Sequence, residues 1–232
     1  MLLLPGMPGT DALFKPLVEE LGDHFETSTV SYPPDEALGY KEHLNLVISR
    51  IPKEKPYFIL GESYSGPLAV MAAARSPGNL LGIILVATFV TSPMPAWMGR
   101  LKRFARGPIL DMRPRPLIID RLIGRDCHEK TRRWIHESLP RLKNDVLAAR
   151  IASVLDVNVR EELKNSRVPV LYIAGARDWL IGKKCIDVIW LCRPDVEIKV
   201  IEGVHMILQT RPDDSAQAII DFCSRVIGSP KG

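Results

Sequence analysis

The chain has 232 residues, of which 46% are hydrophobic and 25% charged, and its formal net charge at pH 7 is +4. This composition is ordinary for a soluble protein, and the length suits one well-buried domain with room for an insertion. The modest net charge gives no indication of nucleic-acid binding, and no apolar run approaches the roughly 20 residues of a membrane span. The four cysteines are scattered, so we expect reduced thiols and a cytoplasmic protein rather than a disulfide framework or zinc site.

Strand and helix patterns alternate through the first part of the chain. Strands are expected at residues 2–4, 27–32, 57–60 and 81–89, and helices at residues 11–21, 39–51 and 68–75. The last of these strands is almost continuously apolar, which is typical of a strand covered on both faces. The alternation predicts a parallel sheet with right-handed crossovers.

The alternation stops over residues 90–165, which combine Pro-rich connections with helical patterns at 129–139 and 141–155. This segment holds sixteen lysine and arginine residues against nine acidic ones, whereas the rest of the chain is mildly acidic. We interpret it as a helical cap inserted between two strands.

The alternation resumes after the basic segment, with strands expected at 169–174 and 196–201 and helices at 181–191 and 212–227. The fold class is therefore predicted as α/β, with a mostly parallel doubly wound sheet of about six strands and an inserted helical cap. Residues 1–89 would form the first part of the core, residues 90–165 the cap or lid, and residues 166–232 the second part of the core.

The stretch from 57 to 67, Tyr-Phe-Ile-Leu-Gly-Glu-Ser-Tyr-Ser-Gly-Pro, passes from a strand into a helix through a very short turn. Gly61 has no Cβ to obstruct such a turn. Ser63 then lies at its apex, with its hydroxyl at a helix N-terminus that favours developing negative charge. The alternative is a serine in an ordinary strand-to-helix loop.

Three residues with complementary chemistry follow three different predicted strands: Ser63, Asp178 and His205. The carboxyl ends of parallel strands meet at one edge of a sheet, where catalytic groups gather. An imidazole can take the serine proton during attack, and a buried carboxylate can fix its tautomer. Among five histidines, His205 is the one that follows a strand and a glycine. Asp156 and Asp187 are the alternatives for the acid.

An acyl-transfer site also needs backbone N–H groups that face the substrate carbonyl oxygen. The residue after the nucleophile, Tyr64, supplies one of them, and the first loop should supply the other. Pro5 and Pro8 carry no N–H, so Gly6 or Met7 must donate, and we favour Met7. The alternative is that residues 5–9 form an ordinary turn.

Taken together, these motifs resemble those of the α/β-hydrolase-fold serine esterases along nearly the whole chain. The resembling segments are residues 61–66 (the nucleophile elbow), 5–10 (the oxyanion loop), 175–178 (the acid turn), and 203–205 with 211–212 (the histidine loop). The resemblance implies a serine nucleophile, whereas epoxide hydrolases and haloalkane dehalogenases of this fold carry an aspartate at the elbow. No dinucleotide loop or metal-ligand cluster appears, so neither a cofactor nor a metal is expected.

The chain departs from the family pattern in three places. Pro5 stands where many members have histidine, and Ser65 replaces a glycine of the elbow. The chain also begins at what would be the family's third strand. None of these departures removes Ser63, Asp178 or His205.

The substrate is expected to be a small-molecule carboxylic ester with a small to medium acyl group, cleaved by a carboxylesterase through an acyl-enzyme. Apolar residues after Pro93 either form the core of the cap or line the substrate pocket, namely Met94, Trp97, Met98, Leu101 and Phe104.

Two other functions remain open at this point. Basic residues of the cap could dock an acidic acyl carrier or coenzyme A, which would make the enzyme a carrier-linked esterase or thioesterase; alternatively they form a solvated helix face. They are Arg100, Lys102, Arg103, Arg106, Arg113 and Arg115. The third hypothesis is a non-catalytic ligand receptor on the same fold.

Overall fold

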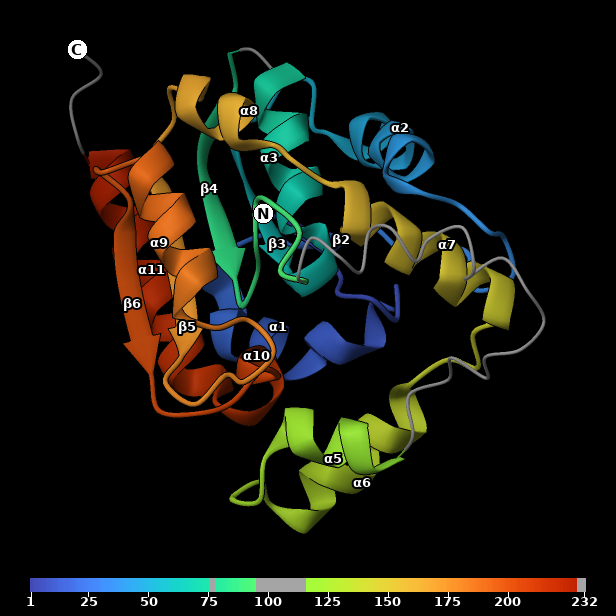
Figure 1. Cartoon of the computed structure of the whole chain (residues 1–232). Coiled ribbons are helices and arrows are strands. Elements are labelled where there is room, and N and C mark those ends of the chain that lie inside the picture. The colour runs from blue at the N-terminus through green and yellow to red at the C-terminus, as the bar shows by residue number, and fades with distance from the viewer. Residues whose placement is uncertain (76–77, 95–115, 229–232) are drawn as a thin grey trace.

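A six-stranded sheet in the order β2-β1-β3-β4-β5-β6 forms the centre of the molecule (Figure 1). The computed structural model describes residues 1–75, 78–94 and 116–228. The strands are β1 (Leu2–Leu4), β2 (Ser28–Thr29), β3 (Tyr57–Glu62), β4 (Leu80–Val86), β5 (Val170–Gly175) and β6 (Glu197–Ile201). Every pair of neighbouring strands is parallel, which confirms the predicted sheet.

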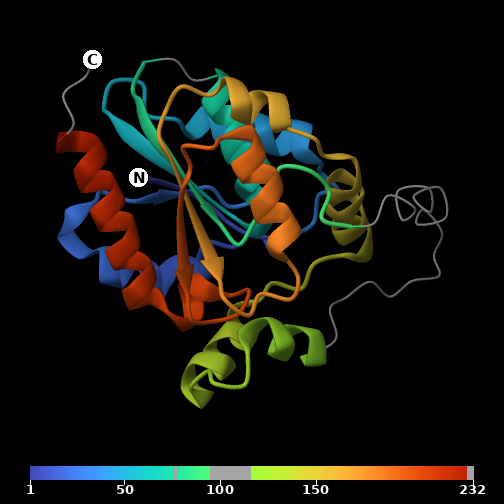
Figure 2. The ribbon, with the colours of Figure 1, turned by 60° about the vertical axis from the view of Figure 1, so that its left-hand side comes forward.

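Helices cover both faces of the sheet, so the predicted doubly wound α/β architecture is confirmed (Figure 2). One face packs against α1 (Lys15–Leu21), α10 (Ile207–Thr210) and α11 (Pro212–Gly228). The other packs against α2 (Tyr40–Arg50), α3 (Gly66–Arg75), α8 (Arg160–Asn165) and α9 (Lys183–Cys192). Successive residues of β3 alternate between the two cores, with Ile59 in one and Leu60 in the other. This burial on both faces explains why the inner strand β4 is almost continuously apolar.

The described part of the segment between β4 and β5 is helical. It contains α5 (Pro116–Ile123), α6 (Glu129–Ser138) and α7 (Asn144–Asp156), followed by α8. Helices α5 and α6 form a hairpin that projects beyond the sheet in Figure 1. Ile123 and Ile135 of the hairpin pack with Leu13 and Met206 in a small separate core. The helices predicted at 129–139 and 141–155 are present, and the division into core and cap stays a prediction.

The strand β2 is much shorter than the predicted 27–32. Its partner β1 ends at Leu4, and Pro5 has no N–H with which to continue the ladder. The extended chain after β2 instead makes separate backbone hydrogen bonds that do not continue the ladder. The Val30 N–H donates to Leu3 O (3.0 Å), and the Tyr32 N–H donates to Gly9 O (2.8 Å). The helix predicted at 11–21 is present as η1 (Ala12–Phe14) and α1, whereas the short helices α5, α8 and α10 were not predicted.

None of the helices in the described ranges combines the length and apolar character that crossing a membrane requires.

Candidate active site

The turn between β3 and α3 holds Ser63 in the left-handed region of backbone space, with φ of +49°. A non-glycine residue in this region is strained and persists only where its surroundings enforce it. Close packing on both sides enforces it here. A Cβ on Gly61 would lie 2.6 Å from Ser65 O, and one on Gly66 would lie 2.0 Å from Thr88 Oγ1. These glycines let the helix approach the strand closely and leave Ser63 at the apex.

A continuous chain of hydrogen bonds joins the three side chains that the sequence singles out. Ser63 Oγ lies 2.9 Å from His205 Nε2, and His205 Nδ1 lies 2.8 Å from Asp178 Oδ2. The side chains of His205 and Asp178 are 8% and 3% exposed. The structure thus brings all three together at the carboxyl edge of the sheet, with the imidazole between the hydroxyl and a buried carboxylate.

Backbone groups hold Asp178 in this arrangement. Its Oδ1 accepts hydrogen bonds from the N–H groups of Leu180 (2.9 Å) and Ile181 (3.0 Å), which leaves Oδ2 for His205. The acid turn also packs directly on the histidine loop, because a Cβ on Gly175 would lie 2.5 Å from Val204 O. The two loops are therefore fixed relative to each other.

The two alternative acids lie elsewhere. Asp187 is on α9, where it pairs with Lys183 at 2.5 Å and is 49% exposed. Asp156 is the last residue of α7. Neither is the carboxylate that His205 contacts.

The Ser65 side chain, which departs from the family pattern, links the elbow to the first loop. It is fully buried, its hydroxyl donates to the carbonyl of Pro5, and it lies 2.7 Å from the Tyr32 hydroxyl. The sequence shows the serine in place of glycine, but the contact with Pro5 was not predicted from it. The available signal was the serine itself, because a buried hydroxyl needs a hydrogen-bond partner such as a backbone carbonyl.

The first loop lies against the nucleophile. A Cβ on Gly6 would be 3.6 Å from the Cβ of Ser63 and 3.7 Å from Glu62 Oε2. The donation of the Met7 and Tyr64 N–H groups to a substrate oxygen stays a prediction.

Glu62 is a buried acid beside the nucleophile that sequence reasoning did not single out. Its burial raises the pKa of the carboxyl group. A hydrogen bond from Gln209 Nε2 (2.9 Å) and the nearby His205 lower this pKa to a smaller extent. A charged residue that ends an otherwise apolar strand was the signal that could have found it.

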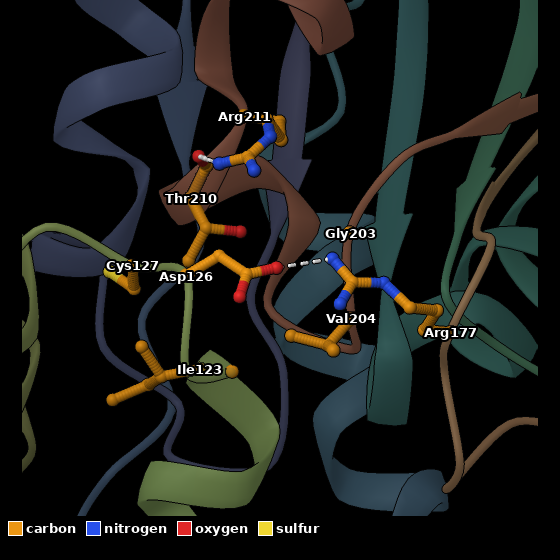
Figure 3. Close-up of a pocket in the computed structure, with 9 residues that line it drawn as sticks. Ile123, Asp126, Cys127, Arg177, Gly203, Val204, Thr210 and Arg211 are labelled. Atoms are coloured by element: carbon orange, nitrogen blue, oxygen red, sulfur yellow. Dashed lines mark hydrogen bonds and ion pairs between the residues drawn. The ribbon is translucent and has the colours of Figure 1, made fainter.

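A small pocket lies between the acid turn, the histidine loop and the α5–α6 connection (Figure 3). Asp126 points across it to Arg177, with 2.6 Å between the carboxylate and the guanidinium. Val204 and Arg211 line the same pocket. Met94, which is the described member of the predicted substrate pocket, does not line it.

The predicted substrate pocket falls mostly on the part of the chain that is not described. Met94 is half-buried, whereas Trp97, Met98, Leu101 and Phe104 lie outside the described residues. The six basic residues proposed to dock an acyl carrier also lie outside them. Within the described ranges, no group of three or more His, Cys, Asp or Glu side chains is arranged to hold a metal ion.

Comparison with known sequences gives one distant relative. No protein-family model matches the chain. A match to phytyl ester synthase 1, chloroplastic, of Arabidopsis thaliana is 31% identical over 126 residues. It covers 50% of this chain and 17% of the plant protein, so the chain corresponds to a small part of that protein's length.

Solved structures match over almost the whole chain. A lipase-esterase related protein from Clostridium acetobutylicum aligns with a TM-score of 0.78 and 16% identity, over 95% of this chain and 93% of that one. MenH from S. aureus aligns with a TM-score of 0.79 and 18% identity, over 98% and 94%. A thermophilic esterase from Thermogutta terrifontis aligns with a TM-score of 0.74 and 20% identity, over 97% and 89%. The chain is therefore a protein of the α/β-hydrolase fold.

Proposed function

We propose that the chain is a serine carboxylic-ester hydrolase. The observation that carries this proposal is the hydrogen-bonded series Ser63–His205–Asp178, in which each contact is shorter than 3 Å. The strained backbone of Ser63 and the close approach of the first loop support it further, because a nucleophile at a tight turn beside a loop with backbone N–H groups is what this chemistry needs.

The first half of the reaction forms an acyl-enzyme. His205 Nε2 accepts the proton of Ser63 as Oγ attacks the ester carbonyl, and the N–H groups of Met7 and Tyr64 bind the oxygen that becomes negative. Asp178 holds Nδ1–H of the imidazole and stabilises the imidazolium that forms. The intermediate then collapses, and His205 returns its proton to the departing alcohol.

The second half repeats the same steps with water. His205 takes a proton from the water that attacks the acyl group on Ser63, and then gives it back to Oγ as the ester bond to the enzyme breaks. The acid leaves, and the serine is restored. The proton transfer between Ser63 and His205 is supported by the 2.9 Å between Oγ and Nε2, and the role of Asp178 by its 2.8 Å contact with Nδ1.

The experiment that tests this function is a chain-length series of p-nitrophenyl esters measured beside matched acyl thioesters. We expect ester turnover with a maximum at small to medium acyl groups, and covalent labelling of Ser63 by a fluorophosphonate probe. Absence of both labelling and turnover would favour the non-catalytic receptor. A preference for thioesters, with rates that fall steeply as salt is added, would favour the carrier-linked alternative.

A second candidate function is acyl transfer to an alcohol, and the match to phytyl ester synthase favours it. The same acyl-enzyme would pass its acyl group to an alcohol oxygen instead of to water. The ratio of ester to free acid formed from a p-nitrophenyl ester in the presence of a long-chain alcohol separates the two. A hydrolase yields mainly free acid, and a synthase yields mainly the new ester.

A further inference from the structure

The guanidinium of Arg150 lies inside the molecule, between helix α7 and the first loop. The whole residue is 0% exposed. Its Nη1 donates to the carbonyl oxygen of Met7 at 2.7 Å, and its Nη2 donates to the carbonyl oxygen of Pro33 at 2.8 Å. A side chain from the segment between β4 and β5 thus holds the backbone of a residue at the candidate oxyanion site.

No carboxylate pairs with Arg150 in the part of the chain that the structure describes, and Nε has no hydrogen-bond partner there. The Tyr32 ring centroid lies 5.8 Å from the guanidinium carbon. Burying a cation without an opposite charge is costly, and an apolar side chain of similar volume would avoid that cost. An explanation from stability alone is therefore weak, and a role in the function of the loop accounts for the arrangement better.

The first loop is shaped around this guanidinium. Gly9 has φ of +76°, and a Cβ at this position would lie 2.8 Å from Arg150 Nη1 and 2.9 Å from Tyr32 Cβ. The Gly9 N–H donates to Gly6 O at 3.0 Å, which closes the turn that contains Met7. Glycine is needed at residue 9 both for its backbone angle and for the room that Arg150 occupies.

The same buried layer fixes the second candidate donor. Tyr40 donates its hydroxyl hydrogen to Tyr64 O at 2.8 Å, and His43 Nδ1 lies 2.9 Å from the Tyr64 hydroxyl. The rings of Tyr40 and Tyr64 stack with centroids 4.6 Å apart. Met7 and Tyr64, which carry the candidate oxyanion donors, are therefore both held by buried side chains of this layer. Arg150 is the residue of the layer that contacts Met7.

We propose that Arg150 is a positioning residue for the reaction proposed above. By holding the carbonyl oxygen of Met7, it sets the orientation in which the Met7 N–H faces the substrate carbonyl oxygen. The inference rests on the proposed function. It assigns to helix α7 a task beyond packing, because the rigid fork of the guanidinium holds two carbonyl oxygens at once. Lysine at residue 150 would keep the positive charge but lose the planar pair of N–H donors. Methionine would keep most of the volume but lose both the charge and these donors.

The test compares Arg150→Lys and Arg150→Met with a matched pair at Arg193. Arg193 is also buried, at 8% exposed, and donates to the carbonyl oxygens of Ser166 (2.6 Å) and Val168 (3.2 Å), away from the elbow and the first loop. Unlike Arg150, it also pairs with a carboxylate, that of Asp195 (2.7 Å), so its loss should affect stability in particular. Each variant is assayed below its own Tm for kcat, KM, affinity for a trifluoromethyl ketone, and the rate of phosphonylation at Ser63.

We expect Arg150→Met to lower kcat by about a hundredfold with little change in KM. The reason is that moving a catalytic group by about 1 Å costs about that factor in rate. Ketone affinity should fall in parallel, and Arg150→Lys should lie between Arg150→Met and the wild type. Arg193→Met should lower Tm and leave kcat and ketone affinity unchanged. If Arg150→Met does not fold, Gly9→Ala provides a second test, because its Cβ would displace the guanidinium.

The outcomes separate this inference from the function on which it rests. Suppose that the wild type turns over esters, and that Arg150→Met or Gly9→Ala has a lower Tm but unchanged kcat and ketone affinity. The positioning role is then overturned, and the hydrolase proposal stands. If the wild type neither turns over esters nor is labelled at Ser63, both are overturned. A fall in kcat and ketone affinity at residue 150 but not at residue 193 supports the positioning role.

Discussion

Ser65 donates its hydroxyl hydrogen to the carbonyl oxygen of Pro5, sixty positions earlier in the chain. This bond joins the turn that carries the nucleophile to the loop that carries the candidate oxyanion donor. The Tyr32 hydroxyl, 2.7 Å from Ser65 Oγ, completes the contact in a fully buried setting. The serine at this position therefore adds a direct link between two parts of the proposed active site.

Removing this hydroxyl should destabilise the protein. We expect Ser65→Ala to lower the free energy of unfolding by about 1–3 kcal/mol, because the Pro5 carbonyl and the Tyr32 hydroxyl lose a buried partner. Urea unfolding measures the change. The control is Ser49→Ala, because that hydroxyl is exposed and bonds Leu46 O on its own helix, so a loss below about 0.5 kcal/mol is expected. Equal losses at both positions would contradict the buried link.

His43 should make the stability of the protein depend on pH. Burial, and then the charge of Arg150, lower the pKa of His43 to about 4 in the folded state. The unfolded chain binds this proton at about pH 6.5, so between these values it holds more protons than the folded chain. The free energy of unfolding should therefore fall as the pH falls from about 6.5 to 4, by about 3 kcal/mol at most.

The charged groups that act on His43 are Arg150, which lowers its pKa, and Glu42, which raises it. Urea unfolding at several pH values should show a flatter profile for His43→Gln than for the wild type. His24→Gln, at an exposed position, should leave the profile unchanged. A His43→Gln profile as steep as that of the wild type would assign the pH dependence to other groups.

Gly66 should tolerate no side chain. A Cβ there would lie 2.0 Å from Thr88 Oγ1 and 2.7 Å from Thr88 Cβ, deep in the core, so we expect Gly66→Ala to cost more than about 3 kcal/mol or to prevent folding. Gly182→Ala is the control, because nothing lies within 4 Å of its added Cβ. Thermal unfolding compares them, and the double variant Gly66→Ala with Thr88→Ala should recover part of the loss. Similar Tm values for Gly66→Ala and Gly182→Ala would contradict the packing argument.

Glu62 should lower the stability of the protein at neutral pH. Because burial raises the pKa of its carboxyl group, the folded state holds this proton to a higher pH than the unfolded state does. The stabilising contribution of Glu62 is thus lost as the pH rises above the unfolded value, and Glu62→Gln should be more stable than the wild type at pH 7. Guanidinium unfolding at pH 7 tests the sign, and a less stable variant would reverse it.

The positions of the strands along the chain and the residues at their carboxyl ends could be predicted from the sequence because both depend on local patterns. Apolar segments and alternation with helices indicated the strands, and the positions of Asp178 and His205 after two of them predicted that these residues lie at one edge. The structure brings them together with Ser63, as expected from that placement.

The supporting contacts could not be predicted in the same way, because they join residues far apart in the chain. Arg150 contacts Met7 across 143 positions, and Gln209 contacts Glu62 across 147. A buried arginine on a helix has no distinguishing local pattern, and its partners are backbone carbonyls that every residue carries. The shortening of β2 likewise depends on where its neighbour β1 ends rather than on the sequence of β2 itself.

The turnover of p-nitrophenyl butyrate by Ser63→Ala tests the proposed hydrolase most directly. The nucleophile is lost and the rest of the hydrogen-bonded series remains, so kcat/KM should fall by at least about 10⁴-fold while Tm stays close to the wild-type value. Turnover by a folded Ser63→Ala protein at the wild-type rate would contradict the proposal.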